Sequence, residues 1–208
     1  MIDVTNIRKN LGRYISQPIV SILARTNLSP NVLSVAGLLV TSGAAVLIAM
    51  GHLIAAGFTV LAAGAFDILD GALARYSNRV TLFGGIFDST IDRLSDAVLL
   101  LGVLGLLLRA PEQSSLFVWL DCDWAILLLF ATLVSSSLVS YMRARAEAAG
   151  LTCQVGIFTR TERIIVLVLG LFLNQIVIAL IIIALLSFIT AGQRFVHIRR
   201  QTEEHTGR

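Results

Sequence analysis

The sequence has little charge, few cysteines and few histidines. Of its 208 residues, 14% are charged and 56% are hydrophobic. Soluble domains carry about a quarter charged residues, so this composition argues against a water-soluble globular protein. The two cysteines are too few for a disulfide framework, and the three histidines have no partners at the spacing of metal ligands or a catalytic triad. Residues 1–28 are polar and basic and lack the apolar region of a cleavable signal peptide.

Long apolar runs fill most of the chain. A helix that spans a bilayer needs about 20 mostly apolar residues, because the hydrocarbon core is about 30 Å thick. Six runs approach this length, at about 31–50, 53–76, 84–108, 124–146, 159–173 and 175–196. The sequence therefore predicts an all-α integral membrane protein with six transmembrane helices, of which the fifth is the shortest.

Basic residues are distributed unequally across this predicted topology. Six spans place both termini on one side, and all 16 lysine and arginine residues except Arg93 and Arg109 fall on that side. The positive-inside rule makes this side cytoplasmic, which predicts a multi-pass protein of the cytoplasmic membrane. The pI near 9.3 then reflects topology and attraction to anionic lipids, and no nucleic-acid partner is expected. Cys122 and Cys153 fall on opposite sides and cannot pair.

The chain divides into three predicted parts. Residues 1–28 mix apolar positions with arginine and lysine, which is typical of an amphipathic helix lying on the cytoplasmic leaflet; a disordered basic tail is the alternative. Residues 29–198 form a six-helix transmembrane domain, and residues 199–208 form a polar cytoplasmic tail.

Acidic residues inside the second and third apolar runs are the most informative feature. They are Asp67, Asp70, Asp88, Asp92 and Asp96. A charge at the bilayer centre costs about 2.5–3.5 kcal/mol even on the lenient insertion scale, so these groups must be near the interface or paired with cations. Spacings of three and four residues place each set on one face of its helix. The two helices are antiparallel neighbours, so we expect the first four carboxylates to converge.

Convergent carboxylates predict a divalent cation. Oxygen-only ligation selects hard ions such as Mg²⁺, Mn²⁺ or Ca²⁺, and two ions sharing bridging carboxylates suit phosphoryl transfer. The alternative is an acidic patch without metal, neutralised by Arg75, Arg79 and Arg93. Small residues near the acids leave room for a nucleotide or pyrophosphate, although each one alone is explained by close helix packing. These are Gly64, Gly71, Ala72, Ala74, Gly84 and Gly85.

A divalent-cation transporter is the competing class, because ion pathways are also built from intramembrane acids. Two features disfavour it. The acids cluster near one interface, and the later apolar runs supply no polar ladder, since 164–173 and 176–186 are almost wholly apolar.

The acidic motif resembles the signature of the CDP-alcohol phosphotransferases, also called CDP-alcohol phosphatidyltransferases. All eight constrained positions are filled at the expected spacing, namely Asp67, Asp70, Gly71, Ala74, Arg75, Gly84, Asp88 and Asp92. The resemblance implies a six-helix membrane fold, usually a homodimer. It also implies transfer of a lipid phosphoryl group from a CDP-linked donor to an alcohol, with release of CMP.

The resemblance also assigns roles to residues. Asp67, Asp70, Asp88 and Asp92 would bind two Mg²⁺ or Mn²⁺ ions, and Asp92 would serve as the general base. The CDP group would contact Asp67, Asp70 and Asp88 together with flanking residues, which are Asn31, Ser34, Gly71, Ala74, Arg75 and Gly84.

A basic cluster in the second half of the chain bears on the identity of the acceptor alcohol. The stretches Arg143-Ala-Arg145-Ala-Glu147 and Arg160-Thr-Glu162-Arg163 are similar to those of phosphatidylinositol-phosphate synthases and their archaeal ether-lipid counterparts. Arginine binds phosphate in a bidentate manner, so we expect Arg143, Arg163 and Arg194 to hold a phosphate on the acceptor. Inositol 1-phosphate is the predicted acceptor, and glycerol 3-phosphate is the alternative. Arginines that merely contact lipid headgroups at helix ends are the simpler explanation.

Overall fold

The computed structural model describes residues 29–77, 81–109 and 121–206, so the predicted amphipathic helix within residues 1–28 lies outside the described residues. Across these ranges the chain forms helices and no strand, which confirms the all-α prediction. The helices are α2 (Pro30–Ala49), α3 (Leu53–Tyr76), α4 (Leu82–Arg109), α5 (Cys122–Ala148), α6 (Arg160–Phe172) and α7 (Ile176–Thr206). Apart from the end of α7, their limits follow the six predicted apolar runs to within about two residues.

Local sequence signals explain where two of these helices begin. Ser29 is extended and Pro30 occupies the first turn of α2, where its missing N–H costs no hydrogen bond. At the start of α6, Thr159 and Glu162 form a capping box, in which the Glu162 carboxylate accepts a 2.7 Å hydrogen bond from the Thr159 backbone N–H. This box fixes the position of Arg160, the first residue of α6.

Helix α7 extends beyond the predicted sixth run, which ended near residue 196. It continues to Thr206, so residues 199–206 of the predicted polar tail are a helical extension of α7. An ion pair between Arg199 and Glu203, 2.8 Å apart and one turn from each other, supports this extension.

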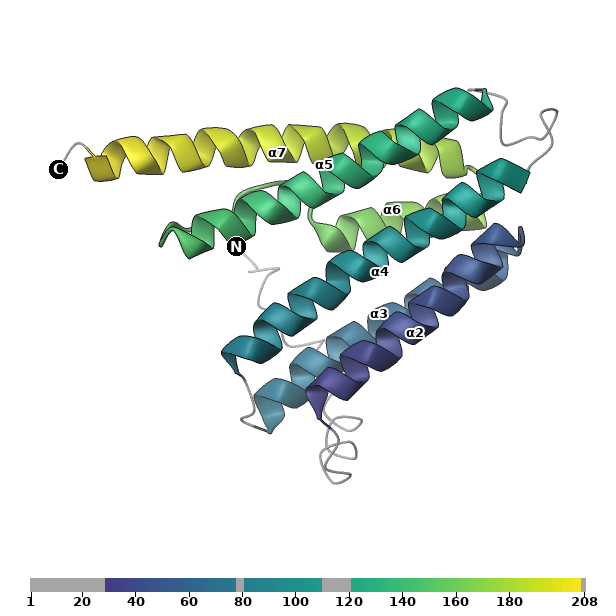
Figure 1. Cartoon of the computed structure of the whole chain (residues 1–208), viewed down its shortest axis with the longest axis horizontal. Helices are drawn as coiled ribbons and strands as arrows, with labels where there is room; N and C mark the ends of the chain where they lie inside the picture. The colour runs from purple at the N-terminus through teal and green to yellow at the C-terminus, as the bar shows by residue number, and fades with distance from the viewer. Residues whose placement is uncertain (1–28, 78–80, 110–120, 207–208) are drawn as a thin grey trace, which may run out of the picture.

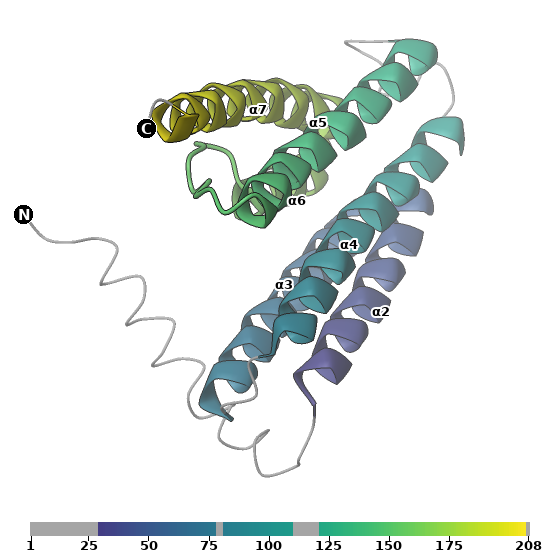
Figure 2. The same cartoon turned by 60° about the vertical axis from the view of Figure 1, so that its left-hand side comes forward.

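The helices form two groups that α6 connects. Figure 1 shows α2, α3 and α4 as one group running up, down and up, and α5 and α7 as a second group beside it, with α7 at an angle to the other helices. Helix α6 contacts both α3 and α7, and α4 contacts α5 (Figure 2). The ends of α3, α5 and α7 and the starts of α2, α4 and α6 lie toward the same end of the bundle. One buried apolar cluster, built from all six helices, joins the two groups.

Four of the described helices are long and apolar enough to cross a membrane, namely α2, α3, α5 and α7. The chain is therefore a membrane protein. Helix α4 carries Asp88, Asp92, Arg93 and Asp96 between positions 88 and 96, and α6 has 13 residues, equivalent to about 20 Å. That α4 and α6 also span the bilayer stays a prediction.

The contact between α2 and α4 depends on the absence of a side chain at Gly102. A Cβ atom there would lie 2.5 Å from the Ala45 carbonyl oxygen and 2.7 Å from the Ala45 Cα. Because these are backbone atoms of a packed helix, they cannot rotate aside. We expect Gly102→Ala to destabilise the protein by about 1–3 kcal/mol, the usual cost of overpacking, measured as a lower Tm in detergent.

Gly43→Ala is the matched control for this substitution. Gly43 lies on α2, and nothing is within 4 Å of the added Cβ. Alanine is the better helix former, so the Tm of this variant should equal or slightly exceed that of the unmodified protein. Equal Tm values for the two variants would show that the close approach of α2 and α4 is not a constraint.

Candidate active site

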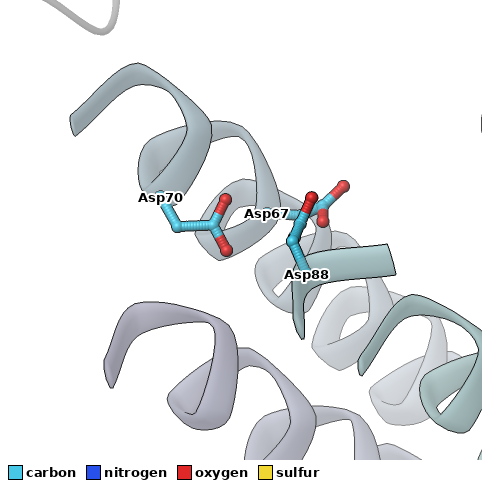
Figure 3. A group of neighbouring side chains, drawn as sticks. All are labelled: Asp67, Asp70 and Asp88. Atoms are coloured by element: carbon cyan, nitrogen blue, oxygen red, sulfur yellow. The ribbon is translucent and has the colours of Figure 1, made fainter. Parts of the chain in front are cut away.

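Three of the predicted metal ligands come together in the half of the bundle where α3 ends and α4 begins. Asp67 and Asp70 project from α3 and Asp88 projects from α4 toward a common space (Figure 3). Each offers one oxygen, and the three oxygens lie within 4.8 Å of one another. Two oxygens on opposite sides of a Mg²⁺ ion, each about 2.1 Å from it, would be about 4.2 Å apart. A small contraction would therefore let the three carboxylates hold a hard divalent cation.

Ser34 of α2 orients one of these carboxylates. Its hydroxyl donates a 2.6 Å hydrogen bond to Oδ2 of Asp70, and both residues are buried. The sequence predicted Ser34 as a nucleotide contact; the structure gives it a direct contact with a predicted metal ligand. This bond offsets part of the cost of burying the Asp70 carboxylate.

Asp92, the predicted base, lies one turn beyond Asp88 on the same face of α4. Its carboxyl group is next to that of Asp67. Oδ1 of Asp92 lies 2.6 Å from Nη1 of Arg160, and the same nitrogen lies 3.0 Å from Oδ2 of Asp67. The structure therefore brings Asp92 to the carboxylate cluster, but in an ion pair with an arginine from α6.

The cation within the cluster differs from those expected. Arg75, Arg79 and Arg93 were the predicted partners if the acids were neutralised without metal. Arg79 lies outside the described residues. Arg93 donates to the backbone carbonyl of Ser89 on its own helix, and the Arg75 guanidinium lies near Gly71. Among the described residues, Arg160 supplies the ion pairs to Asp67 and Asp92.

Asp96 connects Arg160 to a second arginine. Its Oδ1 lies 3.4 Å from Nε of Arg160, and its Oδ2 accepts a 3.0 Å hydrogen bond from Nη2 of Arg163. The connected groups are five carboxylates and two guanidinium groups, a formal excess of three negative charges. This excess favours additional cations, because like charges at such distances repel strongly where water is scarce.

A narrow cleft of about 360 Å³ opens on one side of the carboxylates. All the predicted nucleotide contacts except Asp67 line it: Asn31, Ser34, Asp70, Gly71, Ala74, Arg75, Gly84 and Asp88. A Cβ at Gly84 would lie 3.0 Å from Oγ1 of Thr81 and 3.9 Å from Oδ1 of Asn31. Glycine there keeps the wall of the cleft open. The binding roles of these residues stay predictions.

A wider cleft of about 1100 Å³ lies between the first half of α4, the end of α5 and the start of α6. Its lining includes Arg143, Arg163 and Arg194, the predicted acceptor-phosphate residues, together with Arg160 and Asp92. The strongly exposed side chains of Leu82 and Ile86 line the same cleft. The two clefts share Thr81, Gly85 and Asp88, so they meet at the carboxylate cluster.

The three predicted acceptor residues differ in their surroundings. Arg143 is about half exposed and pairs with Glu147 on its own helix at 2.8 Å. Arg163 is buried and held by Asp96. Arg194 is buried and donates to two backbone carbonyls, those of Val155 at 2.9 Å and Val139. Arg194 thus ties α7 to α5 and the following loop, a structural role that the sequence did not indicate.

Sequence reasoning assigned no role in the site to Arg160, Asp96 or Thr81. In the sequence Asp96 is a fifth acid on the same face of α4, and Arg160 belongs to the basic cluster. A usable signal was the spacing of three between Arg160 and Arg163, which places both guanidinium groups on one face of α6. The link to α4 was not visible because the partners lie more than 60 residues apart.

Known proteins resemble the chain over most of its length. The family profile described as CDP-alcohol phosphatidyltransferase matches residues 27–192. The chain belongs to the CDP-alcohol phosphatidyltransferase family, which makes it a membrane-bound transferase. It is 42% identical to the archaetidylinositol phosphate synthase of Pyrococcus horikoshii over 184 residues, which are 87% of this chain and 89% of the relative. It is 35% identical to the phosphatidylinositol phosphate synthase of Mycobacterium tuberculosis over 158 residues, 75% of this chain and 68% of that one.

Solved structures agree with this assignment. A crystal structure of the Mycobacterium tuberculosis phosphatidylinositol phosphate synthase with CDP-DAG bound superposes with a TM-score of 0.78 at 30% identity. That match covers 89% of this chain and 94% of the other. The same enzyme in complex with manganese and citrate also gives a TM-score of 0.78, covering 88% of each chain. The family assignment confirms the expected enzyme class and excludes the cation transporter that the sequence had left open.

Proposed function

We propose that the chain transfers a phosphatidyl-type group, or its ether-lipid analogue, from a CDP-linked lipid to inositol 1-phosphate and releases CMP. The observation that carries this proposal is the meeting of two clefts at Asp88. One cleft carries the small residues and Arg75 of the family signature, and the other carries five arginines. A nucleotide donor suits the first and a phosphorylated acceptor suits the second. The relatives support the choice of acceptor, because the names of both groups of synthases contain inositol phosphate.

The reaction is a displacement at the lipid-side phosphorus of the donor. The acceptor hydroxyl oxygen forms a bond to this phosphorus, the bond to the bridging pyrophosphate oxygen breaks, and CMP leaves with that oxygen. Asp92 takes the proton of the attacking hydroxyl, as a positioned carboxylate can. Asp67, Asp70, Asp88 and Asp92 would hold two Mg²⁺ or Mn²⁺ ions, which neutralise phosphate oxygens and stabilise the leaving group.

The chain lies in the cytoplasmic membrane as a homodimer, with both termini and the catalytic clefts facing the cytoplasm. Residues 29–198 form the catalytic domain, and the part of α7 beyond residue 198 extends into the cytoplasm. The distribution of basic residues supports this orientation.

An acceptor panel tests the function. The purified protein in detergent is supplied with CDP-diacylglycerol, Mg²⁺ and one acceptor at a time: inositol 1-phosphate, glycerol 3-phosphate, free inositol or serine. We expect CMP release with inositol 1-phosphate, weak release with glycerol 3-phosphate and background release with the two acceptors that lack a phosphate. CMP release driven by glycerol 3-phosphate alone would replace the proposed acceptor, and no release with any acceptor would reject the reaction.

The same assay tests the acceptor phosphate site. Arg143→Gln should raise KM for inositol 1-phosphate about tenfold to a hundredfold, the loss expected for one charge-assisted hydrogen bond, with a smaller effect on kcat. Arg199→Gln is the matched control, because Arg143 and Arg199 each pair with a glutamate one turn later at 2.8 Å on an exposed helix face. An equal KM for the two variants would remove Arg143 from the acceptor site.

A further inference from the structure

Arg160 occupies a position in which it would compete with a bound divalent cation for carboxylate oxygens. Its Nη1 group lies 3.0 Å from Oδ2 of Asp67 and 2.6 Å from Oδ1 of Asp92, two of the four proposed metal ligands. Asp67 also belongs to the group of three carboxylates whose oxygens lie within 4.8 Å of one another. One guanidinium nitrogen therefore bridges the same carboxylates that a divalent ion would draw together.

A divalent ion and this guanidinium group cannot both keep their best contacts with Asp67 and Asp92. Each carries positive charge, so they repel at short distance. They also compete for the same carboxylate lone pairs, which a metal ligand must direct at the ion. The arginine has another carboxylate partner on α4, whereas among the described residues the ion has no other group of three carboxylates.

Asp96 provides the alternative contact for Arg160. It lies one turn beyond Asp92, outside the group of three converging carboxylates, and its Oδ1 is 3.4 Å from Nε of Arg160. Its other oxygen is fixed by the buried Arg163 at 3.0 Å. The capping box at Thr159 and Glu162 fixes the backbone of Arg160 at the start of α6. Loss of the Nη1 contacts would therefore leave Arg160 attached through Nε at the edge of the wide cleft, which it lines.

We propose that Arg160 is a built-in counter-ion of Asp67 and Asp92 that a divalent cation displaces, while Asp96 retains the guanidinium group. This role rests on the proposed function only in taking these carboxylates as metal ligands. Arg160 is in this sense a positioning residue: it neutralises the cluster when no divalent ion is bound, and it withdraws from Asp67 and Asp92 once an ion is bound.

Metal affinity tests the displacement without donor or acceptor. Binding of Mn²⁺ to the full chain in detergent is followed by the EPR signal of free Mn²⁺. Arg160→Gln should lower the Kd for Mn²⁺ by about tenfold or more, since it removes a full positive charge within ion-pair distance of two ligands. Arg160→Lys, which keeps the charge, should remain close to the unmodified protein, and the exposed Arg199→Gln should leave the Kd unchanged.

Two further measurements complete the test. In the presence of chelator, the Tm of Arg160→Gln should be lower than that of the unmodified protein. Added Mn²⁺ should then raise the Tm of the variant by more than it raises the Tm of the unmodified protein. In the unmodified protein, Mn²⁺ should increase labelling of Arg160 by phenylglyoxal severalfold, measured by peptide mass spectrometry, without changing the labelling of Arg199. This labelling needs no variant, so it decides the question even if Arg160→Gln does not fold.

The outcomes separate this inference from the proposed function. An unchanged or higher Kd for Mn²⁺ in folded Arg160→Gln, or Arg160 labelling that is insensitive to Mn²⁺, would overturn the displacement and leave the metal-dependent reaction standing. Failure of the unmodified protein to bind Mn²⁺ at all would overturn both.

Discussion

Asp92→Asn should reduce CMP release by about 1000-fold or more. A positioned general base contributes about 10²–10⁴ to the rate of a proton transfer, and this substitution also removes a charged ligand from the metal cluster. Asparagine has nearly the shape of aspartate, so packing in the first half of α4 is preserved. The measurement is kcat for CMP release at saturating CDP-diacylglycerol, inositol 1-phosphate and Mg²⁺.

The control for this substitution is Asp123→Asn. Asp123 is an exposed acid in the first turn of α5, at the far end of the bundle from the clefts, so its loss should leave kcat unchanged. The Tm and the Mn²⁺ affinity of Asp92→Asn should be measured in parallel, because a folded, metal-binding and inactive variant isolates the proton transfer. An undiminished rate of CMP release by Asp92→Asn would contradict the role of Asp92 as the general base.

Removal of divalent metal should abolish CMP release, and either Mg²⁺ or Mn²⁺ should restore it. The reason is the charge of the cluster, in which five carboxylates face two guanidinium groups. A donor pyrophosphate adds further negative charge and would be repelled without divalent ions to bridge it. The experiment dialyses the protein against chelator, assays CMP release, and repeats the assay after adding back each ion.

Circular dichroism distinguishes the loss of metal from the loss of folded protein. The chelated protein should retain its helical circular dichroism and recover activity on addition of Mg²⁺, which excludes loss through unfolding. Undiminished CMP release at a metal content far below the protein concentration would mean that Asp67, Asp70 and Asp88 converge for a structural reason alone.

The features predicted correctly are those set by local sequence. Apolar runs determine where helices form, so the limits of α3, and those of α6 from Arg160 to Phe172, were predictable to within a residue or two. Spacings of three and four residues set which acids share a helix face, and the short connection between the second and third runs makes those helices neighbours. The convergence of Asp67, Asp70 and Asp88 follows from these two facts.

The features that were missed depend on contacts between distant parts of the chain. Arg160 reaches Asp67 across 93 positions, and Arg194 reaches Val155 across 39. Nothing in the sequence near Arg194 distinguishes an arginine that binds phosphate from one that donates to backbone carbonyls, because both sit near a helix end in a basic region. The extent of α7 beyond residue 196 was missed because polar residues ended the apolar signal while the helix continued.

Apolar side chains at the start of α4 determine how a lipid substrate would reach the reaction centre. Leu82 and Ile86 are exposed yet form part of the wall that also carries the arginines. A donor whose tails stay among neighbouring lipids can therefore offer its headgroup sideways, while the polyol arrives from water. Such an arrangement spares the hydrocarbon chains any passage through an aqueous phase. Supply of donor and departure of product then proceed by diffusion in two dimensions, so turnover would depend on the lipid composition around each molecule.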